Sequence, residues 1–134
     1  MTIRELTSAE QAGLNKALLE IQRRTSARGI LTLDKLTQRW SQFVIEVEAG
    51  YKLSIYDYTN DLCVRDVLDD AIDLAPETVR DVIRASLAMW DDRYRLATRR
   101  STSPLLPGDD IVSRARWHRV PRLLMGELKD DLIS

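Results

Sequence analysis

Apolar residues recur every three or four positions along most of this chain, a spacing that predicts helices rather than strands. The first predicted helix spans residues 7–28. Thr7 and Glu10 match a capping box, in which each side chain binds a backbone amide that the helix leaves without a partner. Gly29 suits the left-handed position that follows a helix end.

The second predicted helix lies between Thr32, a capping residue, and Gly50, which can end it. Its apolar positions fall on a single stripe, formed by Leu33, Leu36, Trp40, Phe43, Val44 and Val47. We expect Trp40 and Phe43 to lie in the core.

Residues 51–60 fit two interpretations. Tyr51, Leu53 and Ile55 alternate with polar residues as in a strand, whereas Ser54 followed by Asp57 is typical of a helix start. A single strand would need a partner strand, and none is evident. We therefore favour a turn followed by a helix, with its firmest part from about residue 60 to residue 74.

Pro76 fits the first position of a fourth helix, which should run to about Thr98. Its expected inward positions are Val79, Val82, Ile83, Leu87, Trp90 and Tyr94. A proline-containing loop is predicted at about 99–110, followed by a short helix that opens at Pro121 and is weakened by Gly126. The pattern predicts an all-α fold, a single domain (residues 1–134) arranged as an irregular bundle of about five helices.

Composition supports this class and narrows the location. Among 134 residues there are only five glycines and four prolines, which argues against a loop-rich or all-β fold. The single cysteine, Cys63, excludes an intrachain disulfide. The polar N-terminus lacks the apolar core of a signal peptide, and no apolar run is long enough to span a bilayer. We expect a cytoplasmic protein with no membrane partner.

Charge is distributed unevenly along the chain, although the formal net charge is only −1. Residues 1–50 carry seven basic and six acidic side chains, residues 51–92 carry four and ten, and residues 93–134 carry nine and five. Such asymmetry indicates either pairing within the fold or two oppositely charged faces. A homodimer that pairs the acidic middle of one copy with the basic end of another is a further interpretation.

The acidic middle contains an amphipathic helix with four aspartates on one face. Asp66, Asp69, Asp70 and Asp73 lie within about 100° of one another on a helical wheel. A solvated face is one interpretation. However, aspartate is a weaker helix former than glutamate, and three of the four lie near the helix C-terminus, where the helix dipole disfavours anions. These features favour a surface for a basic protein partner.

Tyrosines and two further aspartates extend this candidate binding surface. We expect Tyr51 and Tyr56 to anchor the partner, with Asp57 and Asp61 beside them. The alternative is burial with the hydroxyl groups hydrogen-bonded at the rim, and we expect at least one of Tyr51, Tyr56 and Tyr58 to be a core residue.

The C-terminal segment is rich in arginine. Arg114, Arg116, Arg119 and Arg122 surround Trp117 and His118 and are candidate contacts for phosphate or nucleic acid. Pairing with the acidic helix is the alternative. A pI of about 5.8 and the absence of a nucleic-acid-binding motif make nucleic acid the less favoured partner.

No catalytic or cofactor motif is present. His118 is the only histidine, so metal sites built from several histidines are excluded, and the aspartate spacing does not match a calcium-binding loop. Nothing in the local sequence of Cys63 and His118 supports a catalytic dyad. We expect a non-enzymatic protein without cofactors. An enzyme with an unrecognised cleft near Cys63 or His118 is the alternative.

Four short blocks lie in the middle of the chain, namely Gly50-Tyr51, Asp57-Tyr58, Asn60-Asp61-Leu62 and Arg65-Asp66. Together they resemble a block found in small bacterial immunity or antitoxin proteins, and the resemblance covers about residues 40–98. The resemblance implies a cognate toxin that is bound and occluded through the acidic surface. The arginine-rich segment from Arg114 onward has no counterpart in this resemblance.

Overall fold

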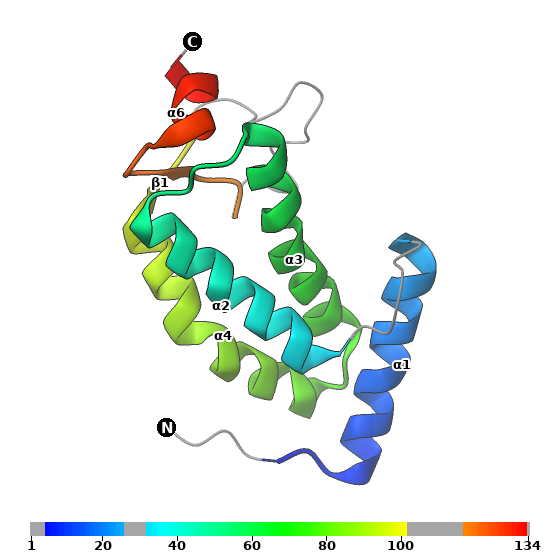
Figure 1. Cartoon of the computed structure of the whole chain (residues 1–134). Coiled ribbons are helices and arrows are strands. Elements are labelled where there is room, and N and C mark those ends of the chain that lie inside the picture. The colour runs from blue at the N-terminus through cyan, green and yellow to red at the C-terminus, as the bar shows by residue number, and fades with distance from the viewer. Residues whose placement is uncertain (1–4, 26–31, 102–116, 134) are drawn as a thin grey trace.

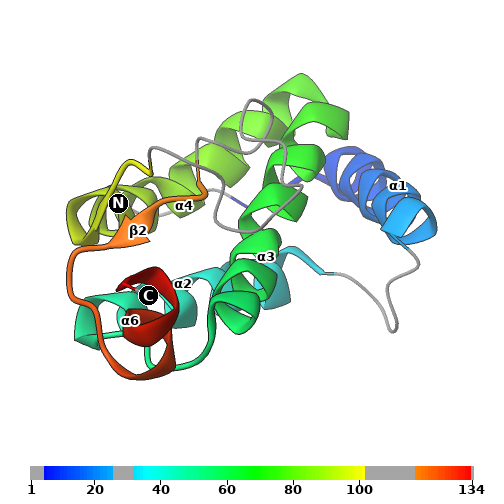
Figure 2. The same cartoon turned by 90° about the horizontal axis from the view of Figure 1, so that it is seen from above.

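The computed structural model describes residues 5–25, 32–101 and 117–133 (Figures 1 and 2). These residues form five helices and one pair of two-residue strands. In chain order the elements are α1 (Ser8–Thr25), α2 (Leu33–Ala49), α3 (Ile55–Leu74), α4 (Glu77–Ala97), β1 (Thr98–Arg99), β2 (Val120–Pro121) and α6 (Gly126–Ile133). The predicted all-α bundle is confirmed.

Helices α2, α3 and α4 form the centre of the bundle. Helix α2 packs against both α3 and α4, while α1 packs against α3 near the C-terminal end of α3 (Figure 1). Helix α6 packs against α3 near its start. Strand β1 pairs antiparallel with β2, with Thr98 opposite Pro121, so the chain after residue 117 is tied to the end of α4.

The predicted helix starts at Thr7 and Thr32 are confirmed by hydrogen bonds. The backbone N–H of Thr7 donates to the Glu10 carboxylate at 3.0 Å, and that of Glu10 donates to the Thr7 hydroxyl at 3.1 Å. Thr32 caps α2 by accepting from the Lys35 N–H. The predicted helix end near Gly29 lies outside the described residues.

The ambiguous segment at residues 51–60 is a turn followed by a helix. Ser54 and Asp57 form a complete capping box, so α3 begins at Ile55, earlier than its predicted firm part. Two side-chain-to-backbone bonds at this point satisfy amides that would otherwise oppose a helix start.

The core is built from the predicted apolar stripes together with aromatic residues from three parts of the chain. Trp40 and Phe43 are buried, as predicted, and their rings lie 5.7 Å apart. Tyr94 from α4 and Trp117 from the C-terminal segment contact Trp40 at ring distances of 5.0 and 5.9 Å. Edge-on contacts such as the last two add to the stabilisation from apolar burial.

The prediction for the last helix was wrong at its start. Pro121 lies in β2, and α6 begins at Gly126, which the sequence pattern had placed inside the helix. Gly126 has a φ of 56°, and a Cβ there would lie 2.5 Å from the Lys52 carbonyl oxygen. Because that carbonyl also accepts from the Glu127 N–H at 2.9 Å, the chain approaches too closely for any residue but glycine. The predicted loop at 99–110 lies outside the described residues from residue 102 onward.

Candidate functional site

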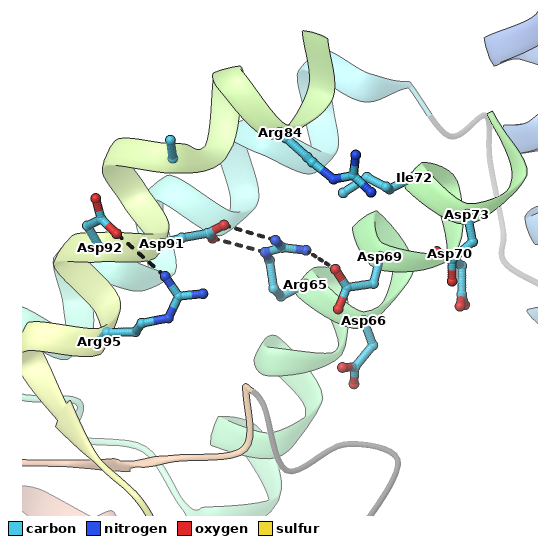
Figure 3. A pocket seen from close by; sticks show the side chains of 11 residues that line it. Arg65, Asp66, Asp69, Asp70, Ile72, Asp73, Arg84, Asp91, Asp92 and Arg95 are labelled. Atoms are coloured by element: carbon cyan, nitrogen blue, oxygen red, sulfur yellow. Dashed lines mark hydrogen bonds and ion pairs between the residues drawn. The ribbon is translucent and has the colours of Figure 1, made fainter. Parts of the chain in front are cut away.

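A polar groove of about 620 Å³ runs between α3 and α4 (Figure 3). Six aspartates and three arginines line it, which gives the lining a formal net charge of −3. We call it the acidic groove, and its lining residues are Arg65, Asp66, Asp69, Asp70, Ile72, Asp73, Arg84, Ala88, Asp91, Asp92 and Arg95.

The inner wall of the acidic groove is a buried ion pair between the two helices. Arg65 on α3 is only 2% exposed, and Asp91 on α4 is 8% exposed. The Arg65 guanidinium donates through Nε and Nη2 to both Asp91 carboxylate oxygens, at 3.0 and 2.9 Å, and through Nη1 to Asp69 at 2.7 Å (Figure 3). This two-pronged geometry is the strongest arrangement available to an arginine and a carboxylate.

Two indole groups complete this ion pair. Trp40 donates its Nε1–H to Asp91 at 3.0 Å, and Trp117 donates its Nε1–H to Asp69 at 2.6 Å. The Arg65 guanidinium also lies 4.0 Å from the Trp117 ring centroid. We call these five residues, Arg65, Asp69, Asp91, Trp40 and Trp117, the Arg65 network. It joins α2, α3, α4 and the C-terminal segment at one point.

The four aspartates of the predicted acidic face therefore have two different roles. Asp69 belongs to the Arg65 network, and Asp66 lies 3.1 Å from His118 Nε2. Asp70 and Asp73 are exposed to solvent. Pairing of the acidic helix with the C-terminal segment is therefore present within the described residues, where Asp69 contacts Trp117 and Asp66 contacts His118.

Asp70 shows the electrostatic cost of gathering these carboxylates. The pKa of Asp70 is raised, first by partial desolvation and then by the negative charges of Asp73, Asp66 and Asp69. Arg24 on α1 lowers it only in part. Ionised Asp70 is therefore less favourable in the fold than in water.

The tyrosines divide as expected between surface and core, but one predicted anchor is corrected. Tyr51 is 2% exposed because its ring packs against Phe43 and Tyr58. Its hydroxyl donates to Asp61 at 2.6 Å. It cannot present a surface to a partner in this structure. Tyr58 is fully buried, whereas Tyr56 is 69% exposed.

The neighbouring aspartates have local structural contacts. Asp57 completes the capping box at the start of α3, and Asp61 accepts the Tyr51 hydroxyl. Their carboxylates are therefore already engaged in holding the turn before α3. Neither lines the acidic groove.

The candidate anion-binding arginines are distributed among different environments. Arg119 donates to the Thr98 hydroxyl at 2.8 Å and to the Thr98 carbonyl at 3.2 Å, so its guanidinium holds the end of α4. Arg122 is exposed. Arg114 and Arg116 lie outside the described residues.

Other candidate chemistry is limited. Cys63 is partly exposed on α3. Within residues 5–25, 32–101 and 117–133, no three or more His, Cys, Asp and Glu side chains are arranged to hold a metal ion. In the same ranges, no helix combines the length and the apolar character that crossing a bilayer requires.

Sequence reasoning missed the burial of Arg65 and Asp91, although a signal was present. Arg65 is seven residues from both Tyr58 and Ile72, which places it about 20° from each on a helical wheel, inside the buried stripe. Asp91 lies about 40° from Leu87 on the wheel of α4, at the edge of its buried stripe. Opposite charges on two buried stripes indicate a pair that crosses the helix interface.

Searches against protein-family models, curated proteins and solved structures found no match to this chain.

Proposed function

We propose that this protein is a non-catalytic binding protein whose acidic groove receives the basic surface of a protein partner. The observation that carries the proposal is the set of exposed carboxylates around the groove. Asp70 and Asp73 line it from α3, and Asp92 lines it from α4 with a side chain that is 75% exposed. A partner that brings lysine or arginine to the groove would neutralise its net negative lining.

Asp70 and Asp73 lie where negative charge is unfavourable for the fold, which supports a role in binding. Asp70 and Asp73 occupy the last turns of α3, where the helix dipole opposes negative charge. The raised pKa of Asp70 reports the same unfavourable crowding. A cationic partner would reduce both unfavourable effects at once. Binding would therefore recover free energy that the isolated protein loses at these aspartates.

The mechanism of such a protein is occlusion. The Arg65 network fixes α3 against α4, so the carboxylates are presented on a rigid frame rather than on a loop. In keeping with the resemblance to immunity and antitoxin proteins, the partner is a toxin whose basic active site or nucleic-acid groove is covered. The setting of this interaction is the cytoplasm.

The experiment is affinity capture from lysate of the native cell with three matched baits. The first is wild type, and the second is Asp70→Asn/Asp73→Asn/Asp92→Asn, which leaves Asp66 and Asp69 to hold the C-terminal segment. The third, Asp34→Asn/Glu127→Gln/Asp130→Asn, makes the same charge change at exposed positions that do not line the groove.

A basic protein retained by the first and third baits but lost from the second is the expected result. Equal recovery on all three baits would reject the acidic groove as the binding surface.

A further inference from the structure

Helix α4 carries two large apolar side chains that the described elements leave exposed. Met89 is 58% exposed and Leu96 is 79% exposed. They are seven residues apart, or two helical turns and about 10 Å along the axis. The exposure of these two side chains stabilises nothing in the isolated chain, so their apolar surface is available to a partner.

This apolar face borders the acidic groove. On a helical wheel Ala85, Met89 and Leu96 lie within about 40°, and Asp92 lies about 20° from Ala85 on the groove side. Asp92 and Ala88 both line the groove. Moving around α4, an apolar strip formed by Ala85, Met89 and Leu96 therefore gives way to Asp92. The groove follows, lined from α4 by Ala88, Arg95 and Arg84 and from α3 by the aspartates that give the lining its net negative charge.

We infer that the partner presents a cationic amphipathic helix, which lies along α4 with its apolar side on Met89 and Leu96 and its lysines or arginines in the acidic groove. The inference rests on the proposed function and specifies the partner's chemistry. Apolar and basic stripes side by side on one helix match the strip and the groove side by side on this protein. An extended basic loop would reach the carboxylates but leave Met89 and Leu96 in water.

The matching surface is rigid enough for a helix. The strip is part of α4, and the far wall of the groove is α3, which the Arg65–Asp91 pair holds in place (Figure 3). The two-turn span from Met89 to Leu96 fits apolar positions at i, i+3 or i+4, and i+7 of a docked helix. A lysine or arginine on the neighbouring face has a stem long enough to cross from α4 toward Asp70 and Asp73.

The test uses the full-length protein and a displayed library of helix-forming peptides of about 20 residues, a length at which isolated helices become stable. The library holds apolar, basic, acidic and neutral residues at every position, so the surface selects its own partner chemistry. The best peptides are then measured against wild type, Met89→Ser/Leu96→Ser and Asp70→Asn/Asp73→Asn. Leu19→Ser, at a 60% exposed position on α1, is the control.

The expected peptides carry apolar residues at helical spacing with lysine or arginine on the adjacent face. Their Kd should rise at least tenfold in each double variant and stay unchanged in Leu19→Ser. Basic peptides without apolar periodicity, weakened only by the aspartate substitutions, would overturn the helix while leaving the proposed function standing. Peptides with the same Kd for both double variants as for wild type, or a library without binders, would overturn both this inference and the proposed function.

Discussion

Arg65 is the residue on which the packing of the central helices depends. Its guanidinium is almost fully buried, yet it has Asp91, Asp69 and the Trp117 ring around it. Removing a charge from water is unfavourable, and only well-placed partners offset this cost. The Arg65 network therefore specifies how α3 and α4 meet, and removal of Arg65 or Asp91 leaves the other as a buried charge without its main partner.

We predict that Arg65→Met lowers the free energy of unfolding by about 3–5 kcal/mol, because Asp91 would remain as a buried charge without its cation. Urea denaturation measures this loss. Arg84→Met is the control, since the Arg84 side chain is 59% exposed in the same groove and should change stability by less than about 1 kcal/mol. A similar small loss in both variants would contradict the role given to Arg65.

Two buried tyrosines make the fold sensitive to alkaline pH. The pKa values of Tyr58 and Tyr94 are raised chiefly by burial, and their hydroxyl groups donate to the Arg119 and Trp117 carbonyl oxygens. In the unfolded chain a tyrosine ionises near pH 10. Above that pH the folded state therefore binds more protons than the unfolded state, so stability is complete below about pH 10 and falls as pH rises.

We predict that Tyr58→Phe removes part of this alkaline loss, up to about 1.4 kcal/mol per pH unit above pH 10. The measurement is the free energy of unfolding from urea titrations between pH 8 and pH 11. Tyr56→Phe, at an exposed position, should keep the wild-type slope. The explanation fails if both variants show the wild-type dependence on pH.

Among the helices, local sequence signals were enough for the starts of α1 and α2, and at α3 they offered the correct start as one of two interpretations. Thr7, Thr32 and Ser54 act within a few residues of themselves, so their effect is visible in the sequence. The start of α6 depends instead on Lys52, more than seventy residues earlier, whose carbonyl meets Gly126. A contact of that kind cannot be inferred from periodicity, which makes Gly126 look like a weak point inside a helix.

We predict that Gly126→Ala destabilises the protein by about 1–3 kcal/mol, because alanine is strained at positive φ and its Cβ would collide with the Lys52 backbone. Thermal unfolding followed by circular dichroism measures the effect. Lys129→Ala, at an exposed position of α6, should stay within about 0.5 kcal/mol of wild type. Tolerance of alanine at Gly126 would reject the close approach of α6 to the turn before α3.

Within the described residues, the aspartates of the acidic middle of the chain fall into two groups, one paired within the fold and one exposed. Asp66 and Asp69 are used within the fold by His118 and Trp117, whereas Asp70 and Asp73 remain on the surface. The helical wheel predicts that the four aspartates share one face. It cannot predict which of them are paired, because the contacts come from a segment about fifty residues later. The apolar strip on α4 was missed for a related reason, since only the packing shows which side of α4 is left uncovered.

The central claim is that exposed carboxylates of the acidic groove bind a basic partner. The most direct measurement is the Kd of the captured partner for wild type and for Asp70→Asn/Asp73→Asn/Asp92→Asn, at low and high salt. We predict at least a tenfold increase in Kd, about 1.4 kcal/mol, and a weaker salt dependence in the variant. An unchanged Kd and salt dependence would show that the groove is a solvated face.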